Sequence, residues 1–99
     1  MRMIDKMIEN LHEELDGATD YAEKFIENQA RGNMSRAAKY KEMAMDELKH
    51  SNFLREMDTA DVDELKKVYK LTEEEAATWE HGMKRLAERS AMVRQMLKM

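Results

Sequence analysis

The sequence predicts an all-α protein in which an antiparallel helical hairpin is followed by a third long helix. The 99 residues include no proline and only three glycines, so few positions would interrupt a helix. Apolar residues recur three and four positions apart over long stretches, which is the period of a helix with one buried face. We expect a single domain, residues 1–99, whose modest core gains stability when copies associate.

The first helix is expected over residues 3–31. Gly32 follows it and can take the left-handed conformation that ends a helix, while Asn33 or Ser35 can cap the next one. A loop of about three residues forces the first two helices into an antiparallel hairpin. The apolar stripe of the first helix consists of Ile4, Met7, Ile8, Leu11, Leu15, Ala18, Ala22, Phe25 and Ile26.

The second helix is expected over residues 35–57. Its apolar stripe consists of Ala37, Tyr40, Met43, Ala44, Leu54 and Met57. Residues 58–71 are expected to form a connector. Asp61 and Glu64 stand at capping-box spacing within it, which predicts a short helix of its own.

The third helix is expected over residues 72–97. Thr72 and Glu75 form a second capping box at its start, and Arg94 and Lys98 suit the negative end of its dipole. Its stripe alternates steps of three and four, which is typical of a helix that packs nearly parallel to its neighbours. The stripe consists of Ala76, Trp79, Met83, Leu86, Ser90, Val93 and Leu97.

Composition narrows the possible partners and compartments. The absence of cysteine excludes disulfides and thiolate metal sites. Charged residues make up 38% of the chain with a net charge of −4, which argues against nucleic acid as a partner. Acidic residues recur near the N-terminus, so we expect neither a signal peptide nor a membrane span, and a cytoplasmic protein. The eleven methionines are interpreted as flexible core filling, with thioether metal binding as the alternative.

Three polar residues fall within or beside the apolar stripes of the hairpin. Glu14 lies in the first stripe between Leu11 and Ala18, Glu47 lies near the centre of the second, and His50 lies on its flank. Carboxylates in an apolar seam are costly unless they are paired or bind a metal. The Glu-x-x-His spacing of Glu47 and His50 places both side chains on nearly the same helix face, where they can share a metal.

Distance along the helices brings these residues to the same level. At about 1.5 Å per residue, Glu14 lies about 28 Å from the turn, Glu47 about 22 Å and His50 about 26 Å. The hairpin therefore predicts that the three meet at a common point in the core as metal ligands. The alternative for Glu47 and His50 is a buried pair hydrogen-bonded to Tyr40 or Lys39, and for Glu14 a side chain that reaches out to solvent.

Two further observations bear on this site. Glu9 and His12 share the Glu-x-x-His spacing, but they lie off the apolar stripe and are expected at the solvated surface. Gly17, close to Glu14, would permit close approach of the helices; the alternative is a tolerated glycine that costs about 1 kcal/mol.

The set of ligands on one chain is half of a di-iron carboxylate site. The full site takes one Glu from each of two helices and a Glu-x-x-His from each of two others. A second copy related by a two-fold axis would supply the missing half, giving a four-helix bundle with two metals per homodimer. The oxygen and nitrogen ligands suit iron or manganese, with zinc as a competitor.

The segments "EELDGATDY", residues 13–21, and "DELKH", residues 46–50, resemble the ferritin-like superfamily. The resemblance covers roughly residues 5–57. It is to the half-length, two-helix members such as encapsulated ferritins and related phage and prophage ferritin-like proteins. It implies ferroxidase activity, the oxidation of Fe(II) by dioxygen or peroxide at the dimer interface, with annular higher assemblies in some members. Tyr21, seven residues after Glu14 as in the family, and Tyr40 are expected to lie beside the ligands and hydrogen-bond to them.

The sequence also departs from this family. We recognise no C-terminal peptide that would address the chain to an encapsulin shell, since it ends in "MVRQMLKM", and packaging is therefore not expected. Beyond the metal ligands we identify no catalytic residue. Two alternatives to a ferroxidase stay open. One is a non-catalytic helical assembly protein, with phage origin as one option, whose site is vacant or holds structural zinc or calcium. The other is a helical interaction module with fortuitous polar core residues.

Overall fold

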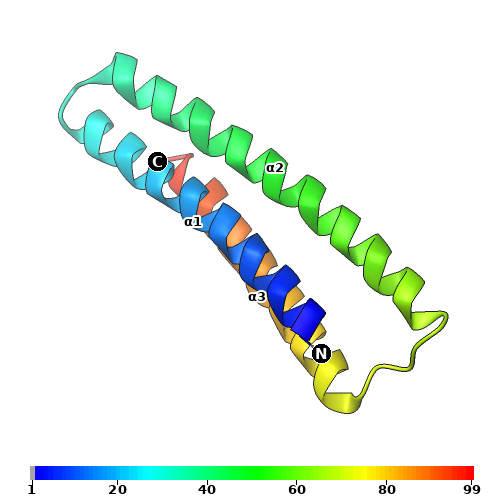
Figure 1. Cartoon of the computed structure of the whole chain (residues 1–99). Helices are drawn as coiled ribbons and strands as arrows, with labels where there is room; N and C mark the ends of the chain where they lie inside the picture. Colours follow the sequence, from blue (N-terminus) through cyan, green and yellow to red (C-terminus); the bar gives the residue numbers. More distant parts are fainter. Residues whose placement is uncertain (1) are drawn as a thin grey trace.

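The structure is a computed structural model that describes residues 2–99, apart from the side chain of Arg2. These residues form three helices and no strand: α1 (Arg2–Ala30), α2 (Met34–Lys66) and α3 (Glu73–Met96) (Figure 1). They make a rod of 54 × 18 × 18 Å. The predicted all-α class is confirmed. Within residues 2–99, no helix is both long enough and apolar enough to cross a lipid bilayer.

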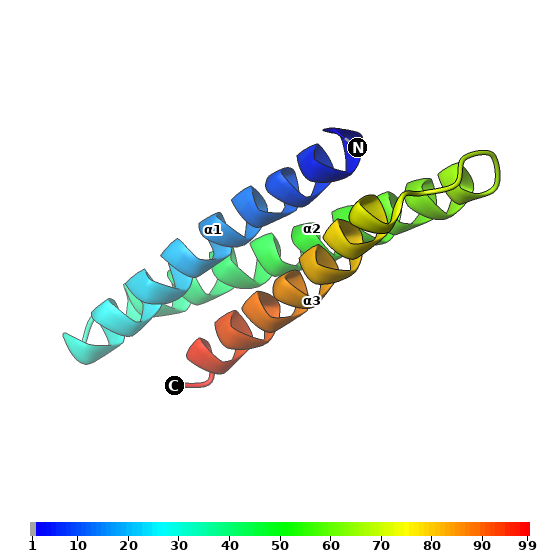
Figure 2. The same ribbon diagram turned by 90° about the horizontal axis from the view of Figure 1, so that it is seen from below.

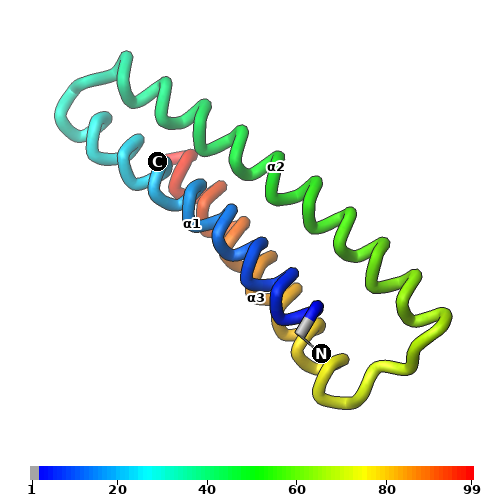
Figure 3. Tube along the Cα trace, in the orientation of Figure 1, coloured from blue at the N-terminus to red at the C-terminus, as the bar shows by residue number. Residues whose placement is uncertain are grey.

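The turn between α1 and α2 forms at the predicted glycine. Gly32 has a φ of +79°, the left-handed region that a glycine enters at no steric cost. Its N–H donates to the carbonyl of Gln29 at 3.1 Å, and the N–H of Asn33 donates to the carbonyl of Asn28 at 2.8 Å. This is the Schellman pattern that closes a helix C-terminus. The antiparallel hairpin follows directly (Figure 3).

The predicted end of the second helix is wrong. We expected it to stop at residue 57 and a separate short helix to begin near Asp61. Instead α2 continues without a break to Lys66, which leaves only residues 67–72 as the connector. Asp61 and Glu64 are therefore exposed residues inside a long helix, not the members of a capping box.

Tertiary packing explains why α2 continues. Residues 58–66 contain no glycine or proline, so nothing in the backbone chemistry stops the helix. Val62 is fully buried and forms a small cluster with Ile4 of α1 and Trp79 of α3. Continued helix keeps Val62 on the face of α2 that already points to the core. Trp79, a member of the predicted stripe of the third helix, is buried in this cluster.

The start of α3 is the predicted capping box. Thr72 Oγ1 accepts a hydrogen bond from the Glu75 N–H at 3.1 Å, and Glu75 Oε1 accepts one from the Thr72 N–H at 2.9 Å. Tyr69 donates its hydroxyl hydrogen to the same carboxylate oxygen at 3.1 Å. The hydrogen bond from the Thr72 backbone, with help from Tyr69, lowers the pKa of Glu75 to about 2.

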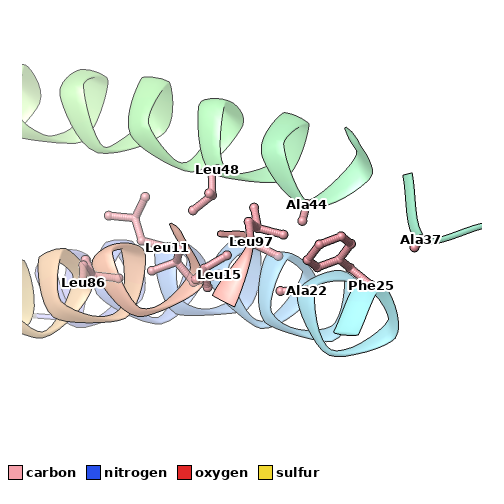
Figure 4. Close-up of a cluster of buried hydrophobic side chains, with 11 residues drawn as sticks. Leu11, Leu15, Ala22, Phe25, Ala37, Ala44, Leu48, Leu86 and Leu97 are labelled. Atoms are coloured by element: carbon pink, nitrogen blue, oxygen red, sulfur yellow. The ribbon is translucent and has the colours of Figure 1, made fainter. Parts of the chain in front are cut away.

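α1 is the central element of the packing. It contacts α2 along one side and α3 along another, and within the described residues no comparable packing joins α2 to α3. α3 runs in the same direction as α1 (Figure 2). The main core extends from the α1–α2 turn to the middle of the rod, where Leu48 of α2 and Leu97 after α3 pack with Leu11 and Leu15 of α1 (Figure 4).

Two contacts fix α3 against α1. Gly82 lies directly over the side chain of Ile8, with no room for a further carbon atom. Two turns further on, Arg89 Nη2 donates to Asp16 Oδ1 at 2.6 Å, and its Nη1 donates to the carbonyl of His12 at 3.2 Å. These contacts show which side of the hairpin the third helix covers, which the sequence does not determine.

Candidate metal centre

The hairpin brings together the three residues that the sequence analysis singled out. One ligand atom from each of Glu14, Glu47 and His50 can be chosen so that all three lie within 4.8 Å of one another. His50 Nδ1 lies 3.0 Å from Glu14 Oε2, a contact across the α1–α2 seam. The predicted levels along the two helices were therefore accurate to within one turn. Neither Tyr40 nor Lys39 takes the place of Glu14 as the partner of His50 in the described structure.

The cluster lies at an edge of the hairpin, and here the prediction of a site in the core was only partly right. Glu47 is half-buried, the side chain of Glu14 is 29% exposed and that of His50 is 54% exposed. The centre of the buried face of α2 is occupied by Leu48 and Ser51, both missing from the predicted stripe. In one chain, the cluster therefore opens to solvent on the side away from the leucine core.

Electrostatics at the cluster favour a bound cation. Burial raises the pKa of Glu47 above its ordinary value. A hydrogen bond with Glu14 and the negative charge of Glu14 raise it further, while His50 acts in the opposite direction. Two carboxylates this close repel one another when both are ionised. A divalent cation between them would remove that repulsion, so these residues fit a metal by their chemistry as well as by their spacing.

The donor set also indicates which metals fit. Two carboxylates and one imidazole are hard to borderline ligands, a combination suited to iron, manganese or zinc. Three ligands from one chain, with the cluster open to solvent, leave further coordination positions for water or for ligands from another molecule. Calcium is a poorer match because it prefers oxygen ligands throughout.

Gly17 lies beside the carboxylate of Glu47. A Cβ at this position would stand 3.5 Å from Glu47 Oε2, which is ordinary van der Waals contact. Close approach of α1 and α2 in this chain therefore does not require the glycine. This favours the interpretation of Gly17 as a tolerated helix glycine, as far as a single chain is concerned.

Tyr21 and Tyr40 pack against each other across the hairpin, one seven residues after Glu14 and the other seven before Glu47. Their ring centroids lie 6.3 Å apart at an interplanar angle of 27°. Among the described residues, neither hydroxyl makes a hydrogen bond to Glu14, Glu47 or His50. Their expected part in supporting the ligands stays a prediction.

The second Glu-x-x-His pair is not part of any metal cluster among the described residues. Glu9 is exposed, as expected, but His12 is half-buried at the contact between α1 and α3, so its predicted place at the solvated surface was wrong. Arg89 Nη1 lies 2.8 Å from His12 Nδ1. Burial first, and then the charge of Arg89, lower the pKa of His12 and favour the neutral imidazole.

The contact of His12 with α3 shows which side of α1 remains open. Residues two positions apart on a helix point in nearly opposite directions. His12 and Asp16 face α3, whereas Glu14 between them faces α2 and the solvent beside it. α3 therefore covers the side of α1 away from the candidate metal centre and supplies no ligand to it.

Comparison with models of known protein families, with curated protein sequences and with solved structures finds no match to this chain. The resemblance to half-length ferritin-like proteins therefore rests on the motifs and their geometry alone.

Proposed function

We propose that this protein binds Fe(II) between two copies of the chain, as a ferritin-like di-iron carboxylate protein, and oxidises it. The observation that carries the proposal is the convergence of Glu14, Glu47 and His50 on one open edge of the hairpin. The three residues agree in helical phase and in level along the hairpin as well as in motif spacing, so the convergence is unlike a chance hit of a short motif.

The surface around the cluster supports completion by a second copy. Met43, His50 and Met57 stand seven residues apart on α2 and so share one face of the helix. The two methionines are 40% and 49% exposed. Apolar side chains on both sides of an exposed ligand are typical of a surface that is buried by a partner. α3 packs elsewhere and leaves this surface accessible.

Two-fold symmetry would then give the ligand set of a complete site. Two copies would contribute four carboxylates and two imidazoles, and four negative charges balance two divalent cations. In a ferroxidase Fe(II) is the substrate, and each ion gives up one electron to dioxygen or peroxide. The part of this chain is to hold the ligands at fixed positions, to exchange the Glu14–His50 contact for contacts with the metal, and to exclude water with its methionines.

The experiment combines metal uptake with solution mass. Fe(II) is added anaerobically to the purified, metal-free protein and air is then admitted, while sedimentation gives the mass. We expect two irons per dimer and the absorbance of oxo-bridged ferric iron. Glu47→Ala should abolish uptake, whereas the matched variant Glu9→Ala, from the exposed Glu-x-x-His pair, should bind as the wild type does. Unchanged uptake by Glu47→Ala, or a monomer at micromolar concentration, would refute the proposal.

A non-catalytic assembly protein is the second candidate, and one observation favours it. The 3.0 Å contact between His50 and Glu14 already gives each of these side chains one partner without a metal. In that case zinc or calcium would raise the melting temperature without any absorbance change on addition of Fe(II) and air. If removal of metal changes neither the mass nor the melting temperature, the metal has no structural role either.

A further inference from the structure

A hollow lies between α2 and α3, on the other flank of α2 from the candidate metal centre. It has a volume of about 330 Å³. It exists because α2 and α3 each pack mainly on α1, and the packing between α2 and α3 is much sparser. Leu48 and Leu97, both buried, form its floor, and Met45, which is 45% exposed, forms part of its wall. We call this hollow the α2–α3 groove.

The rim of the α2–α3 groove is positively charged. Four of the eight residues that line it are basic and none is acidic, although the whole chain has a net charge of −4. The four are Lys41, Lys49, Arg94 and Lys98. All four are exposed, and none of them forms an ion pair with another described residue. The charged group of Lys41 lies over an aromatic ring, with its Nζ 5.6 Å from the centre of the Phe25 ring.

We propose that the α2–α3 groove binds a free anionic amphiphile, namely a single alkyl chain with a carboxylate head group. The apolar floor would take the chain, which removes the exposed surface of Met45 from water. The head group would pair with the rim cations, and Arg94 can bind a carboxylate through two parallel hydrogen bonds. An apolar cavity with a few convergent polar groups is the usual form of a small-molecule site, and the volume lies at the lower end of the usual range.

The dimensions of the groove favour a small molecule over a protein. Its lining on α2 runs from Lys41 to Asn52, which is about 16 Å along the helix axis. A stable protein partner usually buries about 800 Å² on each side. The α2–α3 groove is too short for a partner helix to bury that area within it.

The test uses the full chain and decanoate below its micelle concentration. The probe is the NMR signal of ¹³C-labelled methionine methyl groups. Decanoate should shift the Met45 methyl signal in a saturable way and leave that of Met57, on the opposite flank of α2, unchanged. Decyltrimethylammonium, with the same chain length and the opposite charge, should bind at least tenfold more weakly.

Charge-reversal variants separate the groove from the general charge of the protein. Lys49→Glu with Arg94→Glu should weaken decanoate binding at least tenfold. Lys24→Glu with Lys84→Glu makes the same change in net charge at exposed positions outside the groove, and binding should stay within twofold of the wild type. Iron uptake should be the same in all variants, so a failure of this proposal is distinct from a failure of the proposed function.

Several results would overturn the proposal. Equal binding of the cationic and anionic amphiphiles would show a hydrophobic effect without charge recognition. Equal weakening in both double variants would show a response to net charge alone. Binding to anionic vesicles without binding to free decanoate would assign the surface to a membrane. Self-association that Lys49→Glu with Arg94→Glu abolishes would assign it to a second copy. Because the Met45 signal is read in the wild type, the proposal stays testable even if a variant fails to fold.

Discussion

Glu47→Gln should change the stability of this protein in opposite directions with and without metal. In the metal-free chain Glu14 and Glu47 place carboxylate oxygens within 4.8 Å of one another. At that distance, with an effective dielectric constant of 20, the repulsion of two unit charges is about 3 kcal/mol. His50 offsets part of this and solvent screens the half-exposed pair, so we expect a net gain of about 1 kcal/mol from the neutral amide.

The pH dependence of this gain follows from the raised pKa of Glu47. A carboxyl group whose pKa is higher in the folded state favours the protonated form, so its ionisation costs stability as pH rises above the unfolded value of about 4.5. The difference between Glu47→Gln and the wild type should be near zero at pH 4. It should reach about 1 kcal/mol at neutral pH, which for a chain of this size is about 4–8 °C in melting temperature.

Metal should then reverse the order. A ligand at one hundred times its dissociation constant stabilises the folded state by about 2.7 kcal/mol. The wild type should gain this with Fe(II) under anaerobic conditions or with Mn(II), whereas Glu47→Gln should gain almost nothing. Thermal unfolding followed by circular dichroism measures both effects, with Glu9→Gln as the control for the same chemical change at an exposed site. If Glu47→Gln is the less stable protein without metal, or if metal raises its melting temperature as much as that of the wild type, the reasoning is refuted.

Three further predictions concern the fold. Gly82→Ala should destabilise the protein by about 1 kcal/mol, measured by urea unfolding, because the added carbon would stand 2.9 Å from Ile8 Cγ1 and the strain exceeds the gain in helix propensity. The free energy of unfolding should fall as pH drops below 6.5, because His12 takes up a proton near its ordinary pKa of 6.5 in the unfolded chain, whereas its pKa in the folded protein is lowered. Arg89→Gln should reduce this pH dependence, measured by urea titrations at pH 5.5 and 7.5. Thr72→Ala should cost about 1 kcal/mol in thermal unfolding through loss of the capping box.

Two of these predictions have a matched control variant, and the third has an outcome that would contradict it. Gly17→Ala should be neutral or stabilising by up to about 1 kcal/mol, since its new carbon would make only ordinary contact; a loss as large as that of Gly82→Ala would contradict the packing argument. Thr72→Ser keeps the hydroxyl and should keep most of the stability. An Arg89→Gln protein with the full pH dependence of the wild type would show that the guanidinium does not set the titration of His12.

Local chemistry explains why much of the fold could be predicted from sequence. Gly32 ends α1 because a glycine can take positive φ. Thr72 and Glu75 start α3 because their hydroxyl and carboxyl groups stand three residues apart. Both effects act within a single turn, so the sequence alone locates them. The end of α2 could not be located in this way. It depends on the burial of Val62 by Ile4 and Trp79, which are distant in sequence.

The same distinction applies to the candidate site. Phase and rise are properties of each helix, so the convergence of Glu14, Glu47 and His50 was predictable once the hairpin was. The exposure of these side chains depends on the side of α1 that α3 covers. The sequence does contain an indication of which side that is. His12 and Asp16, four residues apart on the flank of the α1 stripe, present an imidazole and a carboxylate to one partner, and Arg89 on α3 binds both.

The position of α3 links the fold to the proposed symmetry. Had α3 packed on the edge that carries Glu14, the chain would have buried two carboxylates against a stripe that offers no countercharge, since Trp79, Leu86 and Val93 are apolar. Packing on the opposite side of α1 avoids this cost and lets Arg89 of α3 form an ion pair with Asp16 of α1. It also leaves Met43 and Met57 exposed beside the ligands. The proposed function would meet both needs of this edge: two metal ions would supply positive charge, and a second copy of the same edge would cover its apolar border. The solution mass and the metal content should then change together.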